Sequence, residues 1–255
     1  MNEITILYED SDCLFINKPA GLSVHADGKS PVYTLADWVL EKYPTLFSVG
    51  EPLLVQHKGE EITIPKPGIV HRLDKDTSGV MVIAKNQKTY EFFKKQFQDH
   101  KIQKVYHCFV YGWPKENSLD ITDSIGRDSG DIRKWTTGKG SRGITRLAFT
   151  HIEILKRFGN AEYEGKGNTK DGVFSFVEAR PKTGRTHQIR VHLRSINHPI
   201  VSDSLYAQKR EKALGFERQA LHARELGITL PGEKKTTIVA PYPSDFDNAL
   251  KSCGF

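Results

Sequence analysis

A charged turn fixed against an apolar run, together residues 71–84, limits most strongly what this chain can fold into. The turn reads His-Arg-Leu-Asp-Lys-Asp-Thr-Ser-Gly over residues 71–79, and Val-Met-Val-Ile-Ala follows at 80–84. The apolar run has the composition of a buried strand. A rigid scaffold usually presents its functional side chains at such a junction of loop and buried element. The ordinary alternative is a solvated turn, so the rest of the sequence must decide between the two.

Period-two patterns predict a sheet-rich chain. The predicted strands are 4–9, 13–17, 80–84, 104–113, 147–155 and 173–179. The predicted helices are 35–43, 86–101 and 187–197, the last with Thr186 as its N-cap and Pro199 as its stop. Residues 45–68 show no clear period and predict a loop, and 205–226 predict a helix, a loop and a strand. Many strands and few helices indicate an α+β fold with a mixed, mainly antiparallel sheet and flanking helices.

Composition narrows the class of protein. The 255 residues are 38% hydrophobic and 27% charged, which suits a globular core. No apolar run approaches the roughly 20 residues that span a bilayer, and the first residues do not read as a signal peptide. Three scattered cysteines (Cys13, Cys108 and Cys253) suggest reduced thiols and a cytoplasmic location.

Positive charge is concentrated in one stretch of the chain. The net charge is +6, and residues 180–194 hold five cations and no carboxylate. Such a local excess indicates a surface that faces phosphate groups. The basic loop expected at 127–146 is a second candidate for contact with a phosphate backbone.

Three weaker motifs are set aside. Residues 138–143 match G-x-G-x-x-G, but neither a buried strand nor a helix flanks them, so a dinucleotide site is not expected. Ten histidines without Cys-x-x-Cys or His-Glu-x-x-His make zinc improbable. Cys108 lies within an apolar strand, where a thiol is usually inert.

Three residues carry a chemical hypothesis when they are taken together. Asp74 on the charged turn is a candidate nucleophile or base, Tyr106 lies in a strand after a basic run, and Arg190 lies on the helix after the Thr-Gly-Arg turn. Pairing with Arg190 would lower the pKa of the Asp74 carboxyl and keep it ionised in a water-poor site. Taken singly, each residue has an ordinary structural explanation.

The sequence of the charged turn resembles the signature motif of the RluA-type RNA pseudouridine synthases, which isomerise uridine in ribosomal and transfer RNA. Further segments resemble that family's other motifs in type and order, over about residues 4–245: 17–25, 104–112, 180–193 (Arg-Pro-Lys-Thr-Gly-Arg-Thr-His-Gln-Ile-Arg-Val-His-Leu), 198–203 and 221–223. Several motifs that occur in the family's order are far more specific evidence than a single motif.

The resemblance implies the fold, the reaction and the roles of residues. The implied fold has a central RNA-binding cleft, and the implied catalytic residues are Asp74, Tyr106 packed against the target base, and Arg190 in a salt bridge with Asp74. Arg72 would occupy the space left by a flipped nucleotide. The other candidate substrate-binding residues are His71, Lys18 (on the lip of its loop), Arg185, His187 and Gln188. The reaction is redox-neutral, so neither cofactor nor metal is expected.

The chain also departs from the family pattern. Its first strand begins near Ile4, so the expected organisation is one catalytic domain over residues 1–255 without an accessory RNA-binding domain. The sequence shows no obvious exposed apolar stripe, so a monomer is expected. Ser202 stands where the family often has Gly, and the stretch 44–67 is longer than in compact members. The alternatives are a non-catalytic RNA-binding or ribosome-assembly factor on the same fold, and a hydrolase that uses Asp74 with Asp76.

Overall fold

The computed structural model describes residues 3–26, 32–57, 60–159 and 172–254. The chain forms two compact units. Unit 1 comprises Met1–Gln103 with Glu225–Pro241, and unit 2 comprises Lys104–Arg224 with Tyr242–Phe255.

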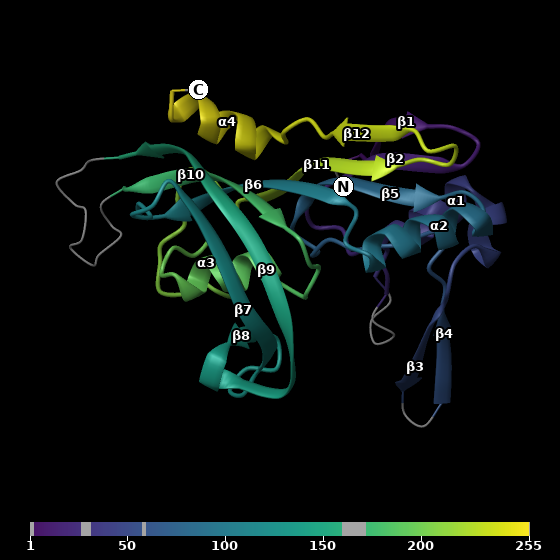
Figure 1. Ribbon diagram of the computed structural model, residues 1–255, viewed down its shortest axis with the longest axis horizontal. Coiled ribbons are helices and arrows are strands. Elements are labelled where there is room, and N and C mark those ends of the chain that lie inside the picture. The colour runs from purple at the N-terminus through teal and green to yellow at the C-terminus, as the bar shows by residue number, and fades with distance from the viewer. Residues whose placement is uncertain (1–2, 27–31, 58–59, 160–171, 255) are drawn as a thin grey trace. The chain divides into compact units, whose positions relative to one another are not determined.

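The sheet of unit 1 is built around the predicted apolar strands (Figure 1). Its strands are β1 (Thr5–Glu9), β2 (Cys13–Lys18), β5 (Ser78–Ala84), the second half of β11 (Leu221–Thr229) and β12 (Lys235–Val239). The pairs β1–β2, β2–β5 and β11–β12 are antiparallel. All seven residues of β5 are buried, so the run that follows the charged turn is a core strand, as its composition predicts.

Two helices of unit 1 begin at side-chain caps. In α1 (Leu35–Lys42), Thr34 and Asp37 form a reciprocal capping box. In α2 (Gln87–Gln98), the Asn86 side chain accepts a hydrogen bond from the Thr89 amide. Both helices lie within a few residues of their predicted bounds, because their apolar stripes and caps agree.

The stretch predicted as a loop before the charged turn contains regular structure. A 3₁₀ helix, η1 (Pro44–Ser48), is followed by the hairpin of β3 (Leu53–His57) and β4 (Glu60–Ile64), while residues 58–59 lie outside the described residues. The loop prediction was therefore wrong for this stretch. The apolar Leu54 is 57% exposed, so it does not mark the buried face by which a half-buried strand is recognised.

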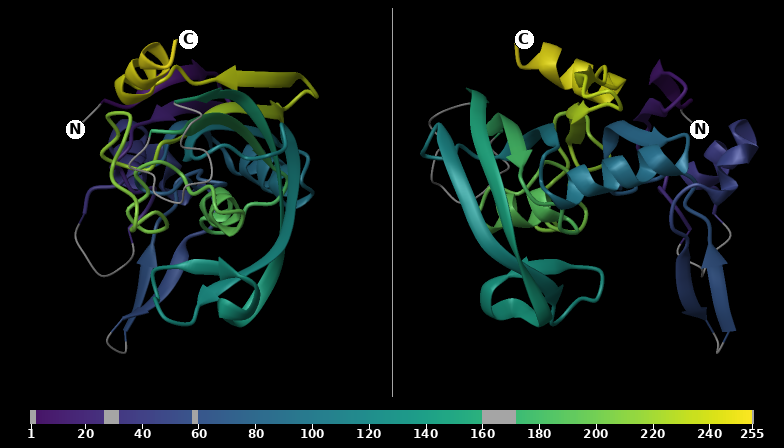
Figure 2. Two further views of the ribbon diagram at one scale, coloured as in Figure 1. Left: turned by 90° about the vertical axis from the view of Figure 1, so that its left-hand side faces the viewer. Right: turned by 45° about the vertical axis from the view of Figure 1, so that its right-hand side comes forward.

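The sheet of unit 2 curves around one helix. Its strands are the first half of β11, β6 (Gln103–Tyr111), β10 (Phe174–Pro181), β9 (Ser141–Phe158), β7 (Ser118–Asp128) and β8 (Trp135–Thr137), in that order. The long strands β7 and β9 bend past α3 (Gln188–Ser195) in both views of Figure 2. The expected basic loop at 127–146 is thus largely β8, the short helix η2 (Gly138–Gly140) and the start of β9.

Helix α3 starts differently from its prediction. Its N-cap is His187, whose φ of 56° is left-handed, and no side chain caps the helix. Thr186 as the N-cap was therefore wrong. Ile189 and Leu193 pack into the aromatic core around Phe109, to which α4 (Ser244–Ser252) adds Phe246. The helix predicted after residue 205 is not formed, since residues 205–220 are turns and bends before β11.

The α+β class and the mainly antiparallel sheet are confirmed by this architecture. Among the described residues, helices are too short or too polar to cross a membrane.

Replacing residues 54–63 by Asn-Gly tests whether the β3–β4 hairpin is dispensable for folding. Leu53 and Ile64 are partners in the hairpin, so a two-residue turn can join them. The free energy of unfolding should change by less than about 1 kcal/mol, because the removed residues whose burial the structure describes, such as Leu54 and Thr63, are exposed or half-buried. Urea denaturation measures it. As a matched control, Leu46→Ala on the buried side of η1 should cost about 2–5 kcal/mol. A deletion as costly as this control would contradict the prediction.

Candidate active site

The charged turn places Asp74 at the end of a short, internally bonded loop in unit 1. The Thr77 amide donates to the Asp74 carbonyl at 3.1 Å, and Leu73 and Thr77 are buried on either side. Strand β5 begins directly afterwards at Ser78. The Asp74 side chain is itself only half-buried, so the turn holds a carboxylate at the margin of a rigid core.

A buried lysine ties this turn to the preceding motif. The Lys18 ammonium donates to the carbonyls of Pro19 (2.8 Å), Leu22 (2.9 Å) and Lys75 (3.0 Å). The Gly21 amide donates to the same Lys75 carbonyl at 3.0 Å. Lys18 has no exposed surface, so its predicted place on the lip of the loop was wrong. A buried ammonium with three acceptors fixes residues 18–22 against residues 74–75.

The two residues before Leu73 differ in their surroundings. The Nε2 atom of His71 accepts from the Val82 amide at 3.1 Å, and the His71 ring stacks on Phe97 at a centroid distance of 4.7 Å. Arg72 is exposed, and its guanidinium lies 3.4 Å from Nε2 of His25. Burial, ahead of the charge of Arg72, lowers the pKa of His25, which favours its neutral form.

Tyr106 lies on β6 in unit 2, where it pairs with Ala179 of β10 and packs half-buried against the aromatic core. Nearby Lys104 donates to the Thr183 carbonyl at 2.8 Å. Burial, followed by the charge of Arg185, lowers the pKa of Lys104 to about 8. Sequence reasoning gave Lys104 no role beyond membership of a basic run.

The Gln188 side chain fixes the Thr-Gly-Arg turn through four hydrogen bonds. Its Oε1 accepts from the Thr183 hydroxyl (2.7 Å) and the Arg185 amide (3.0 Å). Its Nε2 donates to the Phe149 carbonyl and the Thr150 hydroxyl, both at 2.9 Å. These bonds satisfy the side-chain amide, and they join the turn to β9. The buried Gln188 therefore performs the anchoring that a capping residue would have provided.

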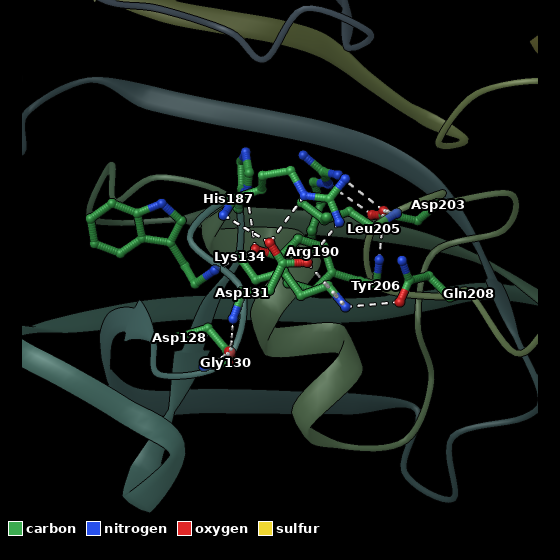
Figure 3. A network of polar contacts seen from close by, with 12 residues as sticks. Asp128, Gly130, Asp131, Lys134, His187, Arg190, Asp203, Leu205, Tyr206 and Gln208 are labelled. Atoms are coloured by element: carbon green, nitrogen blue, oxygen red, sulfur yellow. Dashed lines mark hydrogen bonds and ion pairs between the residues drawn. The ribbon is translucent and has the colours of Figure 1, made fainter.

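Arg190 forms a bidentate ion pair inside unit 2 (Figure 3). Its Nε and Nη2 atoms donate to the two Asp203 oxygens at 2.7 and 3.0 Å, and its guanidinium lies 5.0 Å from the centroid of the Tyr206 ring. Asp203 also accepts from the amides of Leu205 and Tyr206, both at 3.0 Å. Arg190 is 5% exposed and Asp203 is 1% exposed, so the charges are paired away from water.

Tyr206 connects this ion pair to His187 and β8. Its hydroxyl lies 2.8 Å from Nδ1 of His187 and accepts from the Trp135 amide at 2.9 Å. The sequence motif at 198–203 contains Asp203, but reasoning from the sequence gave neither Asp203 nor Tyr206 a role. The sequence did offer a signal for Asp203, because this acidic residue ends a family motif shortly after the predicted catalytic Arg190.

The structure divides the predicted residues between the units. Lys18, His71, Arg72 and Asp74 belong to unit 1; Tyr106, Arg185, His187, Gln188 and Arg190 belong to unit 2. Arg190 is brought together with Asp203, while its predicted pairing with Asp74 stays a prediction. Within the part of the chain that the structure describes, no cluster of three His, Cys, Asp or Glu residues is arranged to hold a metal ion.

These motifs on a mainly antiparallel α+β scaffold indicate a class of RNA-modifying protein. Comparisons with known proteins identify the family within that class. The family model described as RNA pseudouridylate synthase matches residues 12–195. An uncharacterized RNA pseudouridine synthase of Synechocystis is 36% identical over 248 residues, covering 97% of this chain and 68% of that protein. The chain therefore belongs to the RNA pseudouridine synthase family, and it is an isomerase that converts uridine to pseudouridine in RNA.

Other relatives agree in sequence and in structure. The ribosomal large subunit pseudouridine synthase D of Neisseria meningitidis serogroup B is 34% identical, covering 97% of this chain and 60% of that protein. The solved structure of human RNA pseudouridylate synthase domain containing 4 is similar with a TM-score of 0.69 at 25% identity, covering 97% of this chain and 92% of that chain. The family resemblance drawn from the sequence motifs is thus confirmed.

Lys18→Met should destabilise the protein by about 2–4 kcal/mol, because the carbonyls of Pro19 and Leu22 lose their ammonium donor and the Lys75 carbonyl keeps only the Gly21 amide of the two donors described above. Lys75→Met is the matched control, since Lys75 is an exposed lysine on the same turn and should change the free energy of unfolding by less than about 0.5 kcal/mol. Urea denaturation of both variants measures the difference. Equal effects would show that Lys18 does not hold the loops.

His192 should make the protein less stable in acid. The imidazole of this α3 residue is buried, and its Nδ1 atom lies 2.9 Å from the Thr150 hydroxyl oxygen. Burial lowers the pKa of His192 from 6.5 to about 4. Because the unfolded chain binds the proton more tightly, the contribution of His192 is present above pH 6.5 and is lost as the pH falls towards 4. The loss should be about 2–4 kcal/mol.

The measurement is the free energy of unfolding between pH 7 and pH 4. His192→Asn should decline less steeply than the wild type over this range. His100→Asn, at an exposed histidine whose left-handed φ of 56° Asn tolerates, should keep the full decline. Parallel curves for His192→Asn and the wild type would refute the assignment.

Proposed function

We propose that this isomerase modifies uridine in ribosomal RNA, with Asp74 as its catalytic carboxylate and transfer RNA as the alternative substrate. The observation that carries the substrate is the similarity, over 97% of this chain, to relatives named ribosomal large subunit pseudouridine synthase D in Neisseria and in Zymomonas. The observation that supports Asp74 is the turn that presents it, which the buried Lys18 anchors.

The reaction needs what these residues can supply. The bond between ribose C1′ and uracil N1 breaks, the base turns, C1′ bonds to C5, and the C5 proton is replaced by one on N1. No electrons leave the substrate, so no redox partner is consumed. The target uridine must first leave its stack, which costs a few kcal/mol. Asp74 then attacks the sugar, attacks the base or removes a sugar proton, and all three routes use one ionised carboxylate.

Arg190 and Tyr106 are proposed to complete the catalytic group. A guanidinium has five N–H donors, and two of those on Arg190 bind Asp203. The planar fork can therefore serve Asp203 and a second carboxylate together. Asp203 holds Arg190 in a fixed orientation, which suits an ion pair that must keep Asp74 ionised. Tyr106 is proposed to pack against the target base.

The predicted substrate-binding residues divide by their contacts. Arg72 is exposed and suits insertion into the space that the flipped nucleotide leaves. Arg185 and His187 are half-buried on the turn before α3, where they suit contact with the RNA backbone. Lys18, His71 and Gln188 already bind backbone groups, so we propose that they act on RNA indirectly, by holding the loops in place.

We further propose that residues 1–255 act as one catalytic domain and that the protein is a cytoplasmic monomer, where ribosomal and transfer RNA are available. The three cysteines are free, in agreement with a reducing compartment.

Asp74→Asn should abolish pseudouridine formation without unfolding the protein, because it removes the carboxylate and keeps the shape of the side chain. The measurement maps pseudouridine across ribosomal and transfer RNA from cells that lack the gene and from cells restored with each form. A ribosomal position should lose its modification and regain it with the wild type alone. Arg190→Ala is a poorer test, because it would leave Asp203 buried without its cation and so impair folding.

The matched control is Asp99→Asn, a change of the same chemistry at an exposed residue of unit 1, which should restore the modification fully. Restoration by Asp74→Asn would refute Asp74 as the catalytic carboxylate. Loss confined to transfer RNA would refute the ribosomal substrate and support the alternative. Unchanged modification of both RNA classes would refute both substrates.

A further inference from the structure

A cavity of about 300 Å³ opens in unit 2 beyond the C-terminal end of α3. It lies between that helix end, the segment 205–210 and Lys134, which precedes β8. Neither the predicted catalytic residues nor the predicted substrate-binding residues line it. The lining residues are Lys134, Arg194, Asn197, Pro199, Leu205, Tyr206, Ala207, Gln208, Lys209 and Arg210.

The lining of this cavity is strongly cationic. Lys134, Arg194, Lys209 and Arg210 contribute four positive charges, and no carboxylate lines the cavity. A concave wall of one charge focuses the electrostatic potential and attracts counter-ions. The charges come from three separate segments of the chain, so the cluster is made by the fold. Arg194 also suits the negative end of the α3 dipole, but that explains one cation of the four.

Three of these cations are held by neighbouring groups. The Lys134 ammonium donates to Oε1 of Gln208 at 2.8 Å, and Figure 3 shows this contact beside Tyr206. The Arg194 guanidinium lies 6.0 Å from the centroid of the Tyr206 ring, and that of Arg210 lies 5.8 Å from the Tyr111 ring. Among these four cations, Lys134 has a carboxylate oxygen of Asp131 at 3.9 Å, a long ion pair that neutralises little of the charge.

We propose that this four-cation pocket binds a phosphate group, and that in the working enzyme the phosphate belongs to the backbone of the RNA substrate. Arginine forks match phosphate oxygens in a bidentate way. Arg194 follows the predicted catalytic Arg190 by one helical turn, a rise of about 6 Å, and both guanidiniums lie over the Tyr206 ring. An RNA strand whose target uridine lies beside the proposed catalytic Arg190 would therefore pass close to the pocket. The RNA source rests on the proposed function, whereas the phosphate chemistry does not.

The test combines Arg194→Gln with Arg210→Gln in the chain of 255 residues. The control combines Lys115→Gln with Lys251→Gln, which makes the same change of charge at exposed residues of unit 2 outside the pocket. Binding of a fluorescently labelled twelve-residue oligouridylate is measured over a range of salt concentrations. Loss of one phosphate contact should reduce the slope of log affinity against log salt by about 0.7, so the pocket variant should lose about 0.7 and the control almost nothing.

A second measurement separates a backbone phosphate from a free one. Inorganic phosphate at constant ionic strength should raise the melting temperature of the wild type and of the control more than that of the pocket variant. This shift without a change in the RNA slope would refute the RNA source and leave a site for free phosphate. Neither effect, or equal effects in the pocket and control variants, would overturn the proposal.

A substitute variant covers the case in which the double variant does not fold, and the activity of the wild type tests the proposed function separately. If the double variant does not fold, Lys209→Gln alone, at an exposed lysine of the pocket, should reduce the slope in the same direction, by up to about 0.7. Failure of the proposed function would appear separately, as a wild type that forms no pseudouridine, while both binding measurements would still report on the pocket.

Discussion

One buried ammonium determines how the predicted catalytic turn is held. Lys18 carries a charge with no exposed surface, and such a group is stable only where acceptors surround it. Its three carbonyl partners come from two loops, 19–22 and the turn that contains Asp74. The loops must therefore adopt their native shapes together. The position of the Asp74 backbone thus follows from a lysine 56 residues earlier, which makes the first motif a support for the second.

The same principle operates in unit 2 with different groups. Gln188 ties the Thr-Gly-Arg turn to β9, and Asp203 orients Arg190 through two parallel hydrogen bonds. A buried ion pair contributes little net stability, because desolvation offsets its attraction. Its value here is orientation: a guanidinium fixed before substrate arrives needs no reorganisation when charge develops in the transition state. Both units therefore use buried polar groups to set the geometry of a site.

The success of the sequence predictions follows the presence of a buried face. Strands β1, β2 and β5 lie close to their predicted bounds because apolar residues and turn signals coincide there. The β3–β4 hairpin and the start of β9 were missed because apolar residues within them, Leu54 and Ile144, are exposed and mark no buried face. The start of α3 was misplaced by one residue, since a left-handed His187 and the Gln188 side chain replace the expected cap.

Contacts were harder to predict than residues, and the basic stretch 180–194 shows why. A run of cations in sequence suggested one surface facing phosphate groups. In the structure Arg180 pairs with Glu178, Lys182 lies over the Phe149 ring, and Arg190 binds Asp203. Arg194 alone of this run lines the four-cation pocket, where its companions come from residues 134 and 209–210. Strand and helix geometry turns successive side chains to different faces, so a charge cluster in space need not be a charge cluster in sequence. A phosphate site built from distant segments leaves no motif, and only the fold reveals it.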